Sequence, residues 1–199
     1  GRYAMHYVPA VFLNQMKKIS RIDQMNREVL VPVRALRIVS IVPSQTELLI
    51  DLGLKDRVVG ITKFCVHPVE LRREKAIVGG TKKVNIEKVR ALNPDLIIGN
   101  KEENEQNDIL ALEKEFPVWM SDIYKLEDSY RFMEMIGELL DVDTKPMINN
   151  IQKGFSELEK FVESQTQKTA IYLIWDNPTM LAGENTFIND LLQRLKIRN

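Results

Sequence analysis

The feature that most constrains the fold is the stretch at residues 37–49, RIVSIVPSQTELL, in which an apolar strand leads directly into a helix. β-Branched residues dominate its first half, as is typical of a buried strand in a parallel sheet, and Pro43 lacks the donor needed to continue that strand. Ser44 is placed to cap the helix, and Glu47, three residues later, would complete a capping box. Ligands of open α/β sheets bind beyond the carboxyl ends of strands, so this junction is a candidate ligand surface.

Further strands and helices alternate after this junction. Short apolar runs predict strands, and helical spacing of apolar residues predicts helices. The strands are expected at 57–61, 76–78, 95–98 and 117–120, and the helices at 46–52, 86–92, 105–115 and 126–140. Asn85 is placed to cap the helix at 86–92. This alternation predicts an α/β fold with a mostly parallel sheet and helices on both faces.

A longer helix is predicted at 144–165, because apolar residues from Ile148 to Val162 recur every three or four positions. Roughly 22 residues at 1.5 Å each give about 33 Å, which is enough to join two lobes. A strand at 169–175 and a helix at 184–195 follow, and such a pair cannot bury a core. We therefore expect an incomplete second lobe. The predicted organisation is a leader at 1–24, a first α/β lobe at 25–142, a bridging helix at 143–166 and the start of the second lobe at 167–199.

Composition narrows the class of protein and its partners. With 199 residues, 44% of them hydrophobic, the chain can bury a core in one large or two small domains. Its 28 acidic and 28 basic side chains balance, which argues against a dedicated nucleic-acid surface. No apolar run approaches the roughly 20 residues that span a bilayer. The first residues lack the cleavage pattern of a secretory signal, so we interpret 1–15 as upstream sequence and infer no export from them.

Three segments together resemble a known superfamily. They are RIVSIVPSQTELL at 37–49, DLGLKDRVVGIT at 51–62 and VGGTKKVNIEKVRALNPDLIIGN at 78–100. They resemble the first lobe of the helical-backbone metal receptor superfamily, the substrate-binding proteins of ABC importers for cobalamin, haem and iron–siderophore complexes. The resemblance extends from about residue 25 to the last residue.

This resemblance implies two Rossmann-like lobes joined by one long helix, which agrees with the helix predicted at 144–165. It also implies a periplasmic location and capture of a bulky metal complex between the lobes, for delivery to an ABC transporter permease. We expect a monomer without a catalytic cofactor. In cobalamin-binding members, an acidic residue of the matching helix docks on the permease, and here that position is Glu87. The alternative interpretation of Glu87 is a solvated helix carboxylate.

The loops after the predicted strands supply the candidate ligand-binding residues, because they converge at one edge of the sheet. Phe64 and Trp175 offer aromatic faces to a flat macrocycle, and lysines suit carboxylates or the negative charge of a siderophore. Thr81, Lys82 and Lys83 stand where cobalamin-binding members carry a tryptophan, which favours an anionic ligand. The full set is Pro43, Ser44, Gln45, Lys63, Phe64, His67, Thr81, Lys82, Asn100, Lys101 and Trp175.

Cys65 and His67, in the segment TKFCVHP, are a pair of transition-metal ligands close in sequence. Two ligands make a weak site, and Cys65, the only cysteine, also fits a small buried hydrophobic residue. His67 as an axial haem ligand is the more specific hypothesis. The run KEENE at 101–105 is either a solvated loop or the rim of a cleft.

Three alternative functions stay open. A cytosolic binder of a tetrapyrrole or metal complex fits the lack of a recognisable signal, and a signal peptide or lipobox encoded upstream of residue 1 would argue against it. An enzyme is disfavoured, because no Walker sequence or full GxGxxG follows a strand and no catalytic triad can be assembled. A lobe that serves only protein interaction is the third. A pocket shared with an incomplete lobe loses contact area, so we expect weak ligand binding by this chain.

Overall fold

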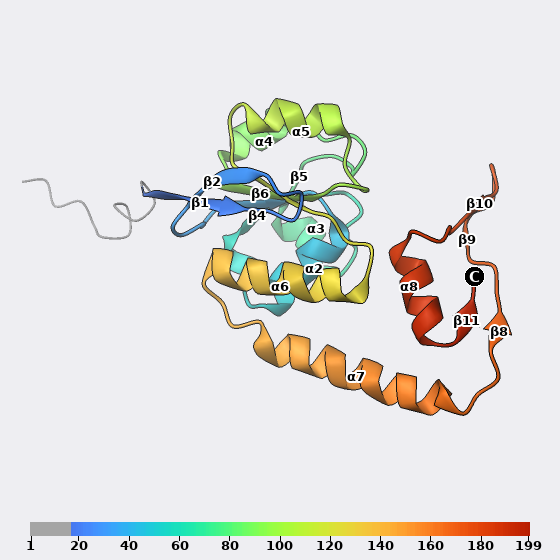
Figure 1. Ribbon diagram of the computed structural model, residues 1–199. Helices are drawn as coiled ribbons and strands as arrows, with labels where there is room; N and C mark the ends of the chain where they lie inside the picture. The colour runs from blue at the N-terminus through green and yellow to red at the C-terminus, as the bar shows by residue number, and fades with distance from the viewer. Residues whose placement is uncertain (1–16) are drawn as a thin grey trace, which may run out of the picture. The chain divides into compact units, whose positions relative to one another are not determined.

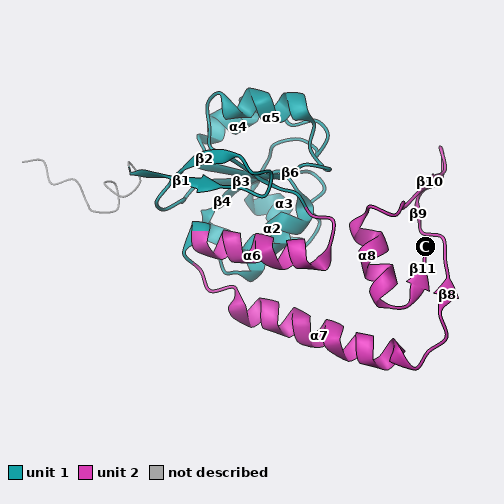
Figure 2. Ribbon diagram, in the orientation of Figure 1, with its two compact units in different colours: residues 1–122, 139–141 teal, residues 123–138, 142–199 magenta. Residues whose placement is uncertain are grey.

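The computed structural model describes residues 17–199, which form two compact units (Figure 1; Figure 2). Unit 1 runs to Asp122 and includes Leu139–Asp141, whereas unit 2 comprises Ile123–Glu138 and Val142–Asn199. Over the described range, no helix combines the length and the apolar character needed to cross a bilayer.

Unit 1 is built on a parallel sheet of five strands in the order β5-β4-β3-β6-β7. The strands are β3 (Ile38–Ser40), β4 (Val58–Ile61), β5 (Ala76–Ile77), β6 (Leu96–Asn100) and β7 (Val118–Ser121). The central strand is β3, whose Ile38 is paired with Val58 on one side and Leu96 on the other. The chain moves outward from β3 to β5 and then returns to β6, so the direction of strand order reverses between β3 and β6. The predicted parallel α/β fold is confirmed.

Helices cover both faces of this sheet (Figure 1). One face carries α2 (Pro43–Asp51) and the short α3 (Leu71–Glu74), and the other carries α4 (Ile86–Leu92) and α5 (Gln106–Glu113). A 3-10 turn, η1 (Lys55–Arg57), precedes β4. The core on the α4–α5 side joins buried strand residues such as Val39 and Ile97 with Val89 of α4 and Leu112 of α5. These helices leave the carboxyl ends of the strands to the connecting loops.

The predicted capping box at the start of α2 is wrong. Val42 is the N-cap, with extended backbone angles, and no side chain caps the helix. Pro43 takes the first position of the helix, where its missing N–H needs no partner. Ser44 therefore lies inside the first turn, where its side chain is exposed. By contrast, Asn85 caps α4 as predicted, because its Oδ1 accepts a 3.0 Å hydrogen bond from the backbone N–H of Lys88.

A hairpin that the sequence analysis did not predict precedes the sheet. Its strands, β1 (Lys18–Ile22) and β2 (Glu28–Pro32), pair in antiparallel fashion. β1 falls within the segment 1–24 that we set apart as a leader, so ordered structure in unit 1 begins before residue 25. Residues 1–16 of that leader lie outside the described residues. The strand escaped prediction because four of the five side chains of KISRI are exposed and therefore show no buried face.

The loop of this hairpin covers the outer edge of β7. The backbone N–H of Met120 donates to Oδ2 of the fully buried Asp23 over 3.2 Å, and Arg27 Nη2 donates to the Val118 carbonyl over 2.9 Å. β7 is the last strand of the sheet, so these two backbone groups have no strand partner. Because an unpaired edge invites pairing with another chain, side chains of the loop here protect the sheet.

Asp23 and Arg27 also organise the loop itself. The Asp23 carboxylate accepts hydrogen bonds from the backbone N–H groups of Met25 at 2.9 Å and Arg27 at 3.0 Å, and from Arg27 Nε at 2.8 Å. Burial acts to lower the pKa of Arg27, but its bonds to Asp23 and Glu113 outweigh this effect and raise the pKa. The Arg27 guanidinium therefore stays charged and continues to neutralise the Asp23 carboxylate.

Unit 2 contains three longer helices and two small pairs of strands. The helices are α6 (Leu126–Leu140, whose last two residues fall in unit 1), α7 (Lys145–Glu163) and α8 (Phe187–Arg194). The strands are β8 (Lys168–Thr169), β9 (Leu173–Trp175), β10 (Met180–Leu181) and β11 (Ile197–Arg198), in the pairs β8–β11 and β9–β10. The long helix predicted at 144–165 is present as α7, whose 19 residues span about 28 Å.

Three helices of unit 2 meet at Arg194. Its guanidinium binds Asp190 of α8 at 2.9 Å, Glu127 of α6 at 2.6 Å and Glu159 of α7 at 3.3 Å. Asp190 also accepts a 2.9 Å bond from the backbone N–H of Leu126, at the start of α6. Burial acts to lower the pKa of Arg194, and the hydrogen bonds to Asp190 and Glu127 more than compensate.

The apolar run at 171–175 is exposed throughout, with Ile171 at 75% and Trp175 at 62% of their full accessible areas. That these residues begin a larger second lobe, and that α7 joins two lobes, stay predictions.

Candidate functional site

The loops at the carboxyl ends of the strands form the candidate site. They comprise residues 41–42 after β3, 62–70 after β4, 78–85 after β5 and 101–105 after β6. Ligands of open α/β sheets bind where the strand order reverses, and here the reversal lies between β3 and β6.

A groove of about 590 Å³, which we call the Lys–Phe groove, lies between the loop after β4 and the turn after β5. The Phe64 side chain is 51% exposed, and the Lys63 ammonium lies 5.0 Å from the centre of its ring, within the range of a cation–π contact. The groove is lined by Lys63, Phe64, Gly79, Gly80, Lys82, Lys83, Val84, Asn85, Ile86 and Glu87.

The turn after β5 presents two of these lysines. The Gly80 N–H donates to the Lys83 carbonyl at 2.9 Å, and the Asn85 N–H donates to the Val78 carbonyl at 2.7 Å. Gly79 has a φ of +117°, and a Cβ added there would lie 2.5 Å from the Lys83 carbonyl oxygen. Only glycine fits this position, so Gly79 fixes a turn that directs Lys82 and Lys83 to the surface.

Gly80 allows the aromatic ring to rest on this turn. A Cβ at Gly80 would lie 3.1 Å from Cε2 of Phe64 and 3.4 Å from Cε of Lys63. The absence of a side chain at Gly80 thus permits close contact between the two loops. The glycine pair Gly79–Gly80 therefore shapes the wall of the groove.

Asn104 connects three of the loops and was missed as a functional residue. Its Nδ2 donates to the carbonyl oxygens of Ile41 at 3.2 Å and Thr81 at 3.0 Å, and its Oδ1 accepts a 2.8 Å bond from the Asn100 N–H. It is 6% exposed, whereas the other four residues of the run KEENE are exposed. The run KEENE is thus neither wholly a solvated loop nor wholly the rim of a cleft. The fact that Asn104 is its one uncharged side chain was the sequence signal that could have marked it as buried.

Gln45 is buried and Asn100 is half-buried, and the side-chain amide N–H groups of both donate to neighbouring groups of the protein. Gln45 Nε2 donates to the Gly99 carbonyl at 3.0 Å and to Ser121 Oγ at 2.7 Å, and Asn100 Nδ2 donates to the same Ser121 Oγ at 2.9 Å. The Asn100 Oδ1 accepts the N–H of Glu102. In this arrangement Gln45 and Asn100, which were both predicted to contact the ligand, support the loops. That either residue touches a ligand stays a prediction.

Cys65 and His67 occupy different environments. The Cys65 side chain is fully buried, and its thiol donates to Thr46 Oγ1 over 3.3 Å and lies 3.4 Å from Thr62 Oγ1. This environment fits the interpretation of Cys65 as a small buried residue, because its sulfur does not reach the surface. His67 is exposed. Across residues 17–199, no three His, Cys, Asp or Glu side chains are grouped so as to hold a metal ion. A metal role for His67 stays a prediction.

The remaining predicted contacts are scattered. Thr81 is buried, and Pro43 is half-buried at the start of α2. The Lys101 ammonium binds the Asp122 carboxylate at 2.7 Å. Trp175 lies in unit 2, where its Nε1 donates to the Asn177 carbonyl at 2.9 Å. The structure thus gathers Lys63, Phe64 and Lys82 of the predicted set, and adds Lys83.

Glu87, the predicted docking residue, lies on α4 at the margin of the groove with its side chain 79% exposed. It is paired with Arg90, which also binds Glu115 through a 2.5 Å bond. The hydrogen bond from Arg90 lowers the pKa of Glu115. This exposed carboxylate is compatible both with docking on a permease and with a solvated helix carboxylate. Docking by Glu87 therefore stays a prediction.

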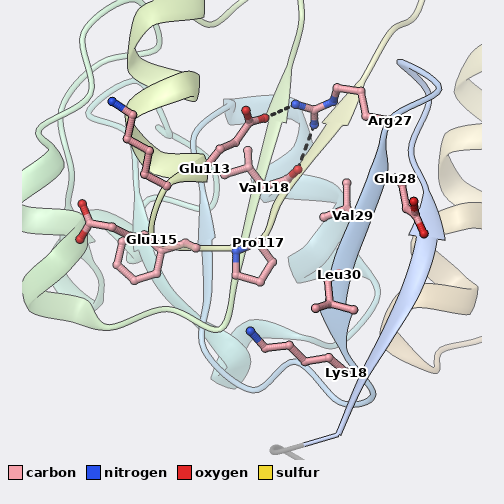
Figure 3. Close-up of a pocket in the computed structure, with 11 residues that line it drawn as sticks. Lys18, Arg27, Glu28, Val29, Leu30, Glu113, Glu115, Pro117 and Val118 are labelled. Carbon is pink, nitrogen blue, oxygen red and sulfur yellow. Dashed lines mark hydrogen bonds and ion pairs between the residues drawn. The ribbon is translucent and has the colours of Figure 1, made fainter.

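A second groove, of about 410 Å³, lies between the hairpin and the connection from α5 to β7 (Figure 3). It is lined by Lys18 and Leu30 on the hairpin side and by Glu113 and Pro117 on the other. Because Pro117 immediately precedes β7, this groove lies at the amino end of that strand, opposite the edge where ligands of such sheets bind. We therefore do not assign the candidate site to it.

Comparison with known proteins points to one family. The sequence pattern of the family described as periplasmic binding protein matches residues 38–199. The chain is 27% identical, over 187 residues, to the uncharacterized ABC transporter substrate-binding lipoprotein YvrC of Bacillus subtilis, covering 89% of this chain and 59% of that protein. It is also 27% identical to the vitamin B12-binding protein of Vibrio vulnificus, covering 75% of this chain and 56% of that protein.

Solved structures share the fold. The petrobactin-binding protein YclQ from Bacillus subtilis has a TM-score of 0.76 at 22% identity, covering 92% of this chain and 66% of that one. A periplasmic heme-binding protein from Pseudomonas aeruginosa has a TM-score of 0.75 at 24% identity, covering 83% of this chain and 62% of that one. The chain spans less than two thirds of the length of the relatives named here.

Proposed function

We propose a function from the premise that this chain belongs to the periplasmic binding protein family. In this proposal it captures a metal complex, of the iron–siderophore, haem or cobalamin type, and delivers it to the permease of an ABC importer. The metal complex is cargo, and the protein performs no catalysis on it.

The Lys–Phe groove is the observation that carries this proposal. It lies at the carboxyl-end edge of the sheet, beyond β4 and β5 and beside the β3–β6 reversal but not at it, and it offers an exposed aromatic ring beside cationic side chains. An aromatic face beside polar groups suits a bulky ligand with a flat or ring-bearing organic part. The names of the relatives support the class of ligand, since they include proteins that bind vitamin B12, heme and petrobactin.

Delivery to a permease is the second part of the proposal. The relative from Bacillus subtilis is named as a substrate-binding lipoprotein of an ABC transporter, which supports a role outside the cytoplasmic membrane. The exposed Glu87 on α4 is the residue of this chain that we propose meets a basic surface of the permease.

Isothermal titration calorimetry tests the capture step. The protein would be titrated with haemin, cyanocobalamin, a ferric tris-hydroxamate and a ferric tris-catecholate. We expect saturable binding, with one ligand per chain, for at least one of these complexes. A folded protein that binds none of the four would contradict the proposed function.

A further inference from the structure

Lys63 and Phe64 sit at the tip of a tight turn whose two corner residues are buried. The turn is closed by the Cys65 N–H, which donates to the Thr62 carbonyl over 3.2 Å. Lys63 and Phe64 are exposed, whereas Thr62 and Cys65 are fully buried. Along the whole connection from β4 to α3, only these two residues are buried. Their side chains therefore attach the loop to the interior of unit 1.

A continuous series of hydrogen bonds leads from this turn into the interior. The Phe64 N–H donates to Thr62 Oγ1 over 3.3 Å, and Thr62 Oγ1 lies 3.4 Å from the Cys65 sulfur. The Cys65 thiol donates to Oγ1 of Thr46 on α2 over 3.3 Å. Thr46 Oγ1 in turn lies 2.8 Å from Oγ of Ser40, the last residue of β3. We call the four fully buried side chains of Thr62, Cys65, Thr46 and Ser40 the thiol–hydroxyl chain.

The thiol–hydroxyl chain has one direction, because each member has a single hydrogen to donate. The Cys65 hydrogen goes to Thr46, so the Thr62 hydroxyl is the donor to the Cys65 sulfur. The Thr46 hydroxyl donates to Ser40 Oγ or directly to the Val42 carbonyl at 3.0 Å. Ser40 Oγ donates to the same carbonyl at 3.2 Å. Both routes end at Val42, the N-cap of α2, and hydrogen bonds aligned in series strengthen one another.

These buried polar positions are not required for packing. Apolar residues of the same shape would fill the space with little effect on stability, because replacing both partners of a buried hydrogen bond is nearly neutral. A buried polar network whose members are all paired instead favours one arrangement over others. Here the favoured arrangement is that of the turn, whose two exposed residues line the Lys–Phe groove. The chain thus connects the wall of the groove to the junction of β3 and α2.

We infer that Cys65 is a positioning residue for ligand binding: through the thiol–hydroxyl chain it fixes the turn that carries Lys63 and Phe64, and so keeps the Lys–Phe groove in its binding form. This inference rests on the proposed function and adds to it a buried residue that does not touch the cargo. A thiol is a weak donor and a weak acceptor, so a serine hydroxyl serves the same purpose at this position. A methyl group does not.

Three substitutions test the inference without any ligand. Cys65→Ala removes the link, Thr46→Val removes the central hydroxyl with almost no change of shape, and Cys65→Ser keeps a donor and an acceptor. Amide hydrogen exchange, followed by NMR, reports on the turn directly. We expect the amides of residues 64 and 65 to exchange about tenfold faster in the first two variants, the equivalent of roughly one lost hydrogen bond. In Cys65→Ser these amides should stay within about twofold of the wild type.

Calorimetry then measures what the turn does for the ligand. Haemin, cyanocobalamin, a ferric tris-hydroxamate and a ferric tris-catecholate would each be titrated into the wild type and the three variants. A turn that takes its binding form for only part of the time lowers the apparent affinity by that fraction. For the complex that the wild type binds most tightly, we expect about tenfold weaker binding by Cys65→Ala and Thr46→Val. Cys65→Ser should restore wild-type affinity.

Ile97→Val is the control for general loss of stability, because Ile97 lies in the core on the α4–α5 side of the sheet, outside the thiol–hydroxyl chain. It should lower the melting temperature but leave both the affinity and the exchange of residues 64 and 65 unchanged. If Cys65→Ala does not fold, Thr46→Val decides the test, because valine preserves the volume of threonine.

The outcomes separate the inference from the proposed function. Faster exchange and weaker binding in Cys65→Ala and Thr46→Val, both reversed in Cys65→Ser, support the inference. Exchange or affinity that is unchanged in Cys65→Ala and Thr46→Val overturns the inference and leaves the proposed function standing. A folded wild-type protein that binds none of the four complexes overturns the proposed function, and with it the role of Cys65 in binding.

Discussion

Replacing Asp23 with alanine is expected to lower the free energy of unfolding by about 3–5 kcal/mol, because several donors lose one fully buried, charged acceptor at once. The substitution removes every hydrogen bond that the fully buried carboxylate accepts, including those from Arg27 and from the Met120 N–H at the edge of β7. The Met120 N–H would then lose its partner, and Arg27 would keep only its bonds to Glu113 and to the Val118 carbonyl. Chemical denaturation followed by circular dichroism measures the change.

Glu28→Ala provides the control in the same hairpin, because Glu28 is exposed and, among the described residues, its side chain bonds only to Ser20 on the neighbouring strand. We expect that variant to lose less than about 1 kcal/mol. A loss for Asp23→Ala as small as for Glu28→Ala would show that the hairpin loop does not protect the edge of the sheet. Asp23→Asn, which keeps the shape but not the charge, should fall between the two.

Replacing Asn104 with alanine is expected to cost about 2–4 kcal/mol of unfolding free energy, because it leaves several buried backbone groups unpaired at once. The carbonyl oxygens of Ile41 and Thr81 and the N–H of Asn100 all lose their partner. The loops after β3, β5 and β6 would then move independently, so we expect ligand affinity to fall as well. Thermal and chemical denaturation, together with calorimetry, measure both effects.

The matched control is Asn107→Ala, at an exposed position of α5 only three residues along the chain. It should change stability by less than about 1 kcal/mol and leave affinity as it is. If Asn104→Ala behaved like Asn107→Ala, the loops would not depend on Asn104 and its role as a connector would have to be abandoned.

Local patterns predicted most of unit 1. The near-continuous apolar runs around Ile38 and Ile97 are buried on both faces, which is why they indicate a parallel sheet correctly. Asn85 caps α4 as predicted because a cap depends on residues within one turn of each other. The long helix α7 followed from a sustained helical spacing of apolar residues.

Features that depend on distant contacts could not be predicted in this way. Asp23 and Met120 are far apart in sequence, and nothing local marks Asp23 as buried. Pro43 overrode the capping box, because a proline at the first position and a capping Ser44 compete for the same turn. Asn104 sits among charged residues, so its burial follows from the loops that it joins and not from its neighbours in sequence. In the same way, the sequence indicated Lys83 only through its place next to Lys82, and the structure adds it to the groove that Phe64 also lines.

Amide hydrogen exchange with and without a bound metal complex tests most directly that the ligand binds at the Lys–Phe groove. Haemin and the ferric tris-catecholate would each be added at saturation, and exchange would be followed along the chain by mass spectrometry. We expect increased protection at residues 62–65 and 79–83, with no change in the hairpin at 18–32. Protection confined to the groove between the hairpin and residues 113–118, with residues 62–65 and 79–83 unaffected, would contradict this expectation.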